Sequence, residues 1–273
     1  MFYTGPTVVS ARGVDDCVRL AETAGTPDPM GTRHRPISHL ETFASLLDAG
    51  KRHGLDLMPE MALNKETKGK PFGANMYLAL QMEPTKDRDG LETIPAMVYR
   101  CGNTQLYNHT AGAGLRWTIC ENSLLEFEEL LMQSKSTTFR NLRSQHDTAM
   151  QGLSAMIDKL QGKHNRLADT EVSNTEAKKI MFDMAFGVRH TDSVVSTDLA
   201  LDEQKGVSYC FPPSKLGEIG RNFFHNRNTM PDCAPNSLSG ILGAVTRALR
   251  GQSPDTKVEQ TDRSLRYLTT LAA

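Results

Sequence analysis

The sequence predicts an α+β fold in which an antiparallel, four-stranded meander packs against helices and a helical C-terminal part follows. Two observations lead to this prediction. Apolar residues alternate with a period of two over four consecutive stretches in the first half of the chain. From residue 136 onward the apolar residues recur instead every three to four positions, which is the spacing of amphipathic helices.

Composition limits the class of protein without naming it. The 273 residues are 38% hydrophobic and 23% charged, as expected of a soluble globular chain. The 31 basic and 32 acidic residues nearly balance, and such a total neither indicates nor excludes a local basic surface. The N-terminus lacks the pattern of a signal peptide, no apolar run is long enough to cross a membrane, and the five cysteines form no close pairs. We therefore expect a cytoplasmic protein with no membrane partner.

The N-terminal region divides into an arm and the first helix. Residues 1–36 are rich in glycine, proline and threonine, so we expect an irregular arm with one short helix around Asp15–Ala24. Ser38 and Glu41 have the spacing of a capping box and predict a helix over Ser38–His53, which Gly54 ends. The predicted organisation is this arm, an α+β core over residues 37–190 and a helical region over 191–273.

The meander is predicted from four alternating stretches, each with one buried face. They are Leu55–Leu63, Asn75–Glu83, Ile94–Cys101 and Leu115–Cys120. The charged loop Asn64–Gly73 joins the first two strands, and Gly112-Ala113-Gly114 lets the chain turn before the fourth. Ser123 and Glu126 again have capping-box spacing and predict a helix to about Leu131.

The second half is predicted to be helical around one long polar loop, Thr191–Gly206. The helices are Ser136–Leu167, Ser173–Arg189, Pro212–Asn226, one capped by Asn236 or Ser237 and ending at Gly251, and Thr261 to the C-terminus. In the first of them, apolar residues step by seven over about three heptads. We favour an amphipathic helix lying on the sheet over a self-associating coiled coil, because so few heptads stabilise a coil weakly.

Motifs for metal, nucleotide or catalytic chemistry are missing from the sequence. The histidines and cysteines show no C-x-x-C, H-x-x-x-H or H-E-x-x-H spacing. No phosphate-binding loop occurs, since Gly112-Ala113-Gly114 precedes a strand and not a helix. Cys120 with His109 or His146 is the one nucleophilic arrangement left open. We predict no metal, no cofactor and no catalytic residue.

Basic residues instead suggest a nucleic-acid surface. Three stretches stand out: the loop with Lys65, the helix with Arg140 and Arg143, and the segment Arg221–Arg227, which mixes cations with aromatic rings. The competing interpretation of the last stretch is an ordinary amphipathic helix with Phe223 turned inward. Tyr99 or Phe223 would stack on bases. The predicted nucleic-acid-binding residues are Lys65, Lys68, Lys70, Arg100, Arg116, Arg140, Arg143, Arg221, Phe223 and Arg227.

Short motifs over roughly Pro36 to Arg250 resemble the phage/plasmid-like proteins of domain-of-unknown-function family number nine-three-two. The residues that carry the resemblance are Arg100–Thr104, Trp117–Asn122, Phe139–His146 and Leu242–Arg247. The turn Asn108–Gly112 departs from the acidic turn of that family. The resemblance implies an origin in a mobile element and a shared fold, but no particular activity.

The expected meander with a long helix behind it is also similar in architecture to phage single-strand annealing proteins, which form rings or filaments on DNA. Our leading hypothesis is therefore a non-enzymatic phage or plasmid protein that forms homo-oligomers and binds single-stranded DNA along the meander. The alternative is an anti-defence protein that inhibits a host protein partner and binds no DNA. An acidic helix over Glu121–Glu129 would then imitate the charge of DNA.

Overall fold

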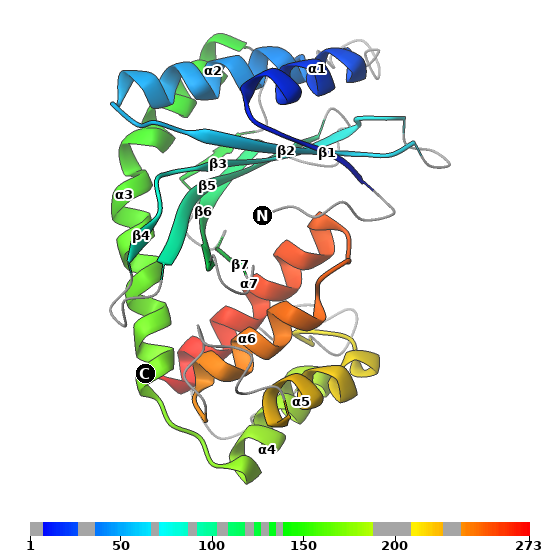
Figure 1. The fold of residues 1–273 in the computed structure, drawn as a ribbon, viewed down its shortest axis with the longest axis vertical. Coiled ribbons are helices and arrows are strands. Elements are labelled where there is room, and N and C mark those ends of the chain that lie inside the picture. The colour runs from blue at the N-terminus through cyan, green and yellow to red at the C-terminus, as the bar shows by residue number, and fades with distance from the viewer. Residues whose placement is uncertain are drawn as a thin grey trace.

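The computed structural model describes most of the chain. The described residues are 8–26, 36–66, 71–86, 92–102, 109–117, 123–126, 131–134, 139–187, 209–225 and 236–273. In Figure 1 the sheet, with two helices above it, occupies one end of the molecule, and a group of helices occupies the other. One long helix runs beside both parts, so the two ends are joined by a continuous element.

The sheet is antiparallel, and its strand order is β1-β2-β3-β5-β6-β7, with β4 beside β5 and β8 beside β6. The strands are β1 (Val8–Arg12), β2 (Met58–Asn64), β3 (Asn75–Gln81), β4 (Thr85–Lys86), β5 (Glu92–Gly102), β6 (His109–Trp117), β7 (Ser123–Glu126) and β8 (Met132–Ser134). The neighbouring strands β2, β3 and β5 correspond to the first three predicted stretches, and β6 overlaps the fourth at Leu115–Trp117 but begins earlier, at His109. The predicted α+β class and meander are thus confirmed.

The first strand was not predicted. Residues Val8–Arg12 pair with β2 along its whole length, from Val8 opposite Asn64 to Arg12 opposite Glu60. The helix α1 (Val14–Ala24) follows at once, as expected. The prediction of an irregular arm is therefore wrong for Val8–Arg12, because a five-residue strand at a sheet edge is too short to show a clear alternation of its own.

Two predictions for the segments that form β6 and β7 are wrong. The predicted turn Gly112-Ala113-Gly114 lies within β6, paired with Val98, Met97 and Ala96 of β5. The predicted helix from Ser123 is wrong, because Ser123–Glu126 forms β7 and pairs with Arg116–Ala113 of β6. A capping box is a local preference of a few residues, and ladder hydrogen bonds to an existing strand outweigh it.

The helices follow the predictions closely. They are α2 (His39–Arg52), α3 (Phe139–Asp169), α4 (Asn174–Phe186), a short 3-10 turn η1 (Pro213–Lys215), α5 (Leu216–Phe224), α6 (Leu238–Ala248) and α7 (Pro254–Leu271). Ser38, Ser173 and Ser237 accept hydrogen bonds from backbone amides at the starts of α2, α4 and α6. The helix α7 begins earlier than expected because Ser253 caps it and Pro254 occupies its first position.

Both faces of the sheet are buried. The face turned to α2 and α3 carries large apolar residues such as Met61, Leu78 and Tyr99, each fully buried. The other face carries smaller residues such as Ala62 and Val98, which are also at most 1% exposed and form a separate cluster. The predicted meander with one solvent-facing side is therefore wrong. No open sheet face exists along these strands for a DNA strand to lie on.

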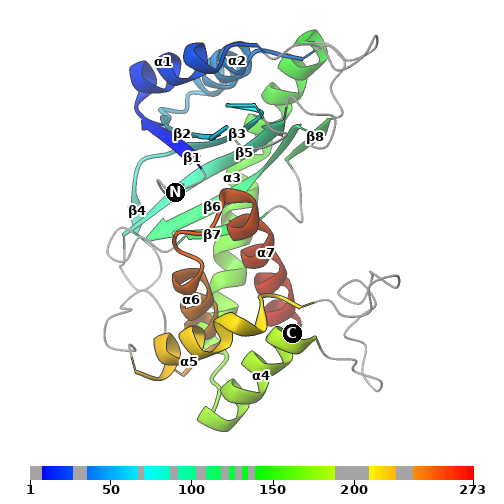
Figure 2. The same cartoon turned by 90° about the vertical axis from the view of Figure 1, so that its right-hand side faces the viewer.

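The apolar residues that recur every seven positions in α3 pack inside the molecule. His146, Leu153, Leu160 and Leu167 are all fully buried in the main core, which confirms the amphipathic helix and leaves no free seam for a coiled coil. Since one residue of a helix adds 1.5 Å, α3 is about 46 Å long. Figure 2 shows it running from the level of α2 down to α4–α7.

The predicted boundary after residue 190 does not separate two packing units. In Figures 1 and 2, α4 lies with α5 and α6 at the end of the molecule away from the sheet. The main core is continuous from Cys17 of α1 through the sheet and α3 to Leu268 of α7. The change from sheet to helical packing therefore occurs along α3.

Two glycines with left-handed backbone offer a matched test of packing. Gly54 has φ +70° and open space where a Cβ would lie, whereas at Gly73, with φ +69°, that Cβ would lie 2.7 Å from Ala24 Cβ. We expect Gly54→Ala to cost about 1 kcal/mol for the backbone alone. Gly73→Ala should cost about 1–3 kcal/mol more, because α1 must move. Urea unfolding of both variants measures the difference, and equal losses would contradict this account of the α1–β3 contact.

Candidate functional site

The two predicted arginines of the sheet, Arg100 and Arg116, lie on the same face but far apart. Arg100 lies opposite Tyr77 and Thr110, and Arg116 lies opposite Ile94 and Ser123. Six residues of β6 separate Thr110 from Arg116, which is about 20 Å along a strand. Both arginines are half-buried, and the small side chains of the strands between them are buried. They are therefore two separate cations at opposite ends of a closed face.

The predicted basic loop is seen only in part. Lys65 is exposed directly after β2, at the end of the sheet nearest Arg100. Lys68 and Lys70 lie outside the described residues. Ala62, not Lys65, is in line with Arg100 across β3, so Lys65 lies three residues further along and two strands away from Arg100.

The basic start of α3 is used to hold two helices together. Arg143 Nη2 lies 2.9 Å from Asp48 Oδ2 of α2, and Arg52 of α2 bridges Asp48 and Asp147. The hydrogen bond from Arg52 lowers the pKa of Asp48, and Arg143 adds to that effect. Arg143 is thus partly neutralised and lies on the helical side of the sheet, away from the face of Arg100. Arg140 is in the first turn of α3, but its side chain is outside the described residues.

The third basic stretch lies at the far end of the molecule. Arg221 is exposed on α5, while Phe223 is only 2% exposed and packs into the core. The prediction that Phe223 stacks on bases is therefore wrong, and so is the same prediction for Tyr99, which is fully buried. Arg227 lies outside the described residues. Figures 1 and 2 place α4 and α5 away from the sheet, so the predicted residues do not form one groove.

A new cation–aromatic surface appears around the exposed part of this stretch. Phe224, next to the buried Phe223, is half-buried, and Lys178 Nζ of α4 lies 5.7 Å from the centre of its ring. Arg221 precedes Phe224 by three residues, and residues at this spacing are neighbours on a helix. We call Lys178, Arg221 and Phe224 the α4–α5 surface. Sequence reasoning found Arg221 but missed Lys178, because packing of α4 against α5 brings them together.

The core contains a hydrogen-bonded chain of polar side chains that links α2, α3 and the sheet. Ser45 Oγ lies 2.9 Å from His146 Nδ1, and His146 Nε2 lies 3.3 Å from Tyr99 Oη. Tyr99 Oη in turn lies 2.6 Å from His109 Nδ1 of β6. Nearby, His39 bonds to the Gly73 carbonyl, and its other ring nitrogen lies 3.7 Å from Cys101 Sγ. We call Ser45, His146, Tyr99 and His109 the buried histidine chain.

Burial keeps these histidines neutral. Burial, with a smaller contribution from His39, lowers the pKa of His109 to about 4; burial, with a smaller contribution from His109, lowers that of His146 to about 3. Burial also lowers the pKa of His39 and raises that of Cys101 to about 12. His109 and His146 thus converge, as a nucleophilic site would require, but deep in the core. Cys120 lies outside the described residues. The buried histidine chain therefore has the properties of a structural network that links the helices to the sheet.

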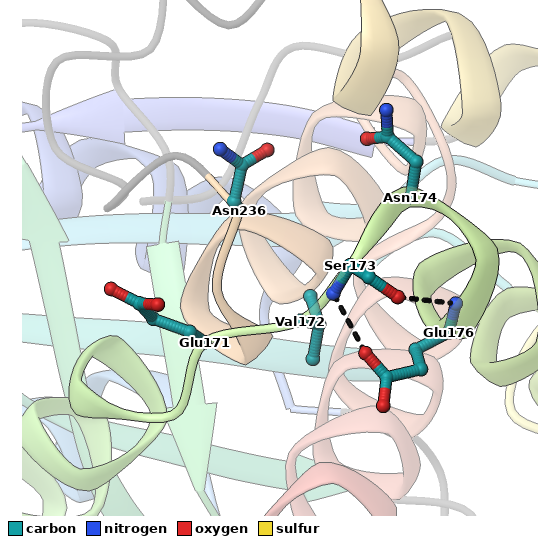
Figure 3. A pocket seen from close by; sticks show the side chains of 6 residues that line it. All are labelled: Glu171, Val172, Ser173, Asn174, Glu176 and Asn236. Atoms are coloured by element: carbon teal, nitrogen blue, oxygen red, sulfur yellow. Dashed lines mark hydrogen bonds between the residues drawn. The ribbon is translucent and has the colours of Figure 1, made fainter.

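A polar hollow of about 530 Å³ lies between the start of α4 and the start of α6. Figure 3 shows the six side chains that line it. Ser173 and Glu176 line it, and each accepts the backbone N–H of the other, at 3.2 Å and 2.8 Å. The Val172 amide donates to the Asn236 carbonyl over 2.7 Å, which ties the two helix starts together. These polar groups are engaged in local structure. Among the described residues, no group of three or more His, Cys, Asp or Glu is placed to hold a metal ion.

The fold defines the chain as an α+β protein with an antiparallel sheet and a helical end. No family model matches the chain. Neither a curated protein nor a solved structure matches it. Within the residues that the structure describes, no helix is long and apolar enough to cross a membrane.

Proposed function

We propose that the chain is a nucleic-acid-binding protein that catalyses no reaction, and that the α4–α5 surface makes the contact. The class is that expected of a phage or plasmid single-strand annealing factor. The observation that supports it is the position of Lys178 over the Phe224 ring, one helical turn from Arg221. Cations beside a partly exposed ring supply both phosphate contact and a surface for a base.

The two cations of this surface differ from Arg143, the predicted cation at the start of α3, in having no carboxylate partner. Within the described part of the chain, neither Lys178 nor Arg221 has a carboxylate partner, whereas Arg143 and Arg52 are bound to Asp48 and Asp147. A paired cation offers less charge to a phosphate, because its carboxylate repels the same anion. The α4–α5 surface is therefore a better candidate than the α2–α3 side of the molecule.

For the predicted alternative, an inhibitor of a host protein, the secondary structure of one feature differs from the expectation. An acidic helix over Glu121–Glu129 would have imitated the charge of DNA, but Ser123–Glu126 is the strand β7. The remaining residues of that segment lie outside the described part of the chain. The alternative is retained as an outcome of the binding test below.

Titration of a labelled short single-stranded DNA at about 50 mM salt tests the proposal. We expect binding by the wild-type protein and a loss of about tenfold or more in the variant Lys178→Ala/Arg221→Ala. Removal of two phosphate contacts should also reduce the slope of log affinity against log salt by about 1.4 for a single strand. Fluorescence anisotropy at several salt concentrations measures both quantities.

The matched control removes two exposed cations at the other end of the molecule. Arg19 of α1 and Lys51 of α2 are exposed, and Arg19→Ala/Lys51→Ala changes the net charge by the same amount. This variant should bind as the wild type does. An absence of binding by the wild-type protein at low salt would reject the proposal and favour the inhibitor. Size measurement with and without DNA tests the predicted oligomer.

A further inference from the structure

Two aromatic rings beside the α4–α5 surface are exposed together. Phe182 is 55% exposed and Phe186 is 45% exposed, and their ring centres are 4.4 Å apart with the planes inclined by 31°. Single exposed apolar residues are ordinary, but neighbouring exposed aromatic rings form a patch that marks a contact site. Both rings lie on α4, which also carries Lys178.

The rings continue the α4–α5 surface in a regular order. Lys178, Phe182 and Phe186 are four residues apart, so they lie on successive turns of one face of α4, about 6 Å apart along its axis. Lys178 also contacts Phe224 of α5. The surface therefore presents a ring, a cation and then two rings in a line. In this order the rings can contact bases, and the cation between Phe224 and Phe182 can contact a phosphate.

The charge around the rings favours an anionic ligand. Lys179, exposed and three residues before Phe182, adds a second cation to the same helix. Glu176 is engaged by Ser173, and its pKa is lowered by the hydrogen bonds in that cap. Asp183, next to Phe182, is half-buried and close enough to Tyr267 of α7 to raise the pKa of that hydroxyl, after the larger effect of burial. The exposed aromatic side of α4 thus carries two exposed lysines, with the half-buried Asp183 beside them.

We propose that Phe182 and Phe186 are base-stacking residues, and that the ligand of the α4–α5 surface is single-stranded nucleic acid and not a duplex. The inference depends on the proposed function and deepens it. In a duplex the base faces are covered by neighbouring base pairs, so exposed rings on a convex helix cannot reach them. In a single strand every base has a free face for an aromatic side chain, whatever the sequence. The lysines then hold the intervening phosphates.

The test compares two pairs of substitutions at the same positions. Phe182→Leu/Phe186→Leu keeps most of the apolar area but removes the aromatic faces, and Phe182→Tyr/Phe186→Tyr keeps the faces. We expect the leucine variant to bind single-stranded DNA about tenfold or more weakly than the wild type. The tyrosine variant should bind within about threefold of the wild type. The salt dependence should be unchanged in both, because no cation is removed.

The outcomes separate this inference from the proposed function. If the wild-type protein binds single-stranded DNA and the leucine variant binds equally well, stacking is wrong while the α4–α5 surface stands. If the wild type binds a duplex of the same length as tightly as the single strand, the ligand class is wrong. If the wild type binds neither, the proposed function itself fails. Circular dichroism melting of both variants should match the wild type, since both positions are exposed.

Discussion

Mild acid should lower the free energy of unfolding of this protein. The unfolded chain binds protons on its histidines below about pH 6.5, whereas burial keeps His109 and His146 neutral until about pH 4 and 3 in the folded state. The unfolded state therefore binds more protons in this window, so stability rises with pH up to about 6.5 and is level above it. Each pH unit below 6.5 should cost about 1.4 kcal/mol for each of the two histidines.

Urea unfolding at several pH values between about 7.5 and 4.5 measures this loss. Near pH 5 the two histidines together should have removed about 4 kcal/mol of stability. The variant His109→Gln/His146→Gln, although less stable at neutral pH, should show a shallower dependence over the same range. The carboxylates titrate mainly below this window. A free energy of unfolding that stays level from pH 6.5 to 5 would contradict the neutral, buried state of these histidines.

Removal of the Tyr99 hydroxyl should lower the free energy of unfolding nearly as much as acid does near pH 5. The Tyr99 hydroxyl lies between His109 Nδ1 and His146 Nε2, at 2.6 Å and 3.3 Å, so Tyr99→Phe leaves two buried nitrogens without this partner. An unsatisfied buried polar group costs about 1–3 kcal/mol, and we expect a total loss of about 2–4 kcal/mol. Chemical denaturation at neutral pH measures it.

The control for this prediction is Tyr209→Phe. Tyr209 is 41% exposed near the end of α4, so its hydroxyl can bond to water and its removal should change stability by less than about 0.5 kcal/mol. Equal effects of the two substitutions would show that the buried histidine chain contributes nothing to stability. A larger loss of stability in Tyr99→Phe would indicate that the buried histidine chain stabilises the packing of α2 and α3 on the sheet.

Much of the fold is predictable because local patterns and the tertiary structure agree. The strands β2, β3 and β5 show period-two alternation, and Ser173 with Glu176 forms the capping box that their spacing predicts. The predictions are wrong where the local sequence pattern and the tertiary structure disagree. Ser123–Glu126 has the local pattern of a helix start but completes the ladder beside β6. The small residues of the second sheet face, such as Ala62 and Ala79, gave no sign that this face is closed.

The candidate site was harder to predict because it depends on distant parts of the chain. The composition of Arg221–Arg227 indicated a cation–aromatic surface, but periodicity did not decide which phenylalanine points inward. The structure buries Phe223 and leaves Phe224 beside Lys178, a neighbour that no local pattern reveals. The pairing of Arg143 with Asp48 is equally invisible in the sequence, since both look like ordinary solvated charges.

The long helix α3 makes the two ends of the molecule dependent on each other. Its first half fills the core beneath the sheet through His146 and Leu153, and its second half fills the helical end through Leu160 and Leu167. A fragment that stops before Phe139 would leave the sheet without its largest cover. A fragment that starts after Asp169 would leave α6 and α7 without their contact to α3. We therefore expect the chain to melt as a single cooperative unit, and each terminal half to be less stable once it is cut away from the other.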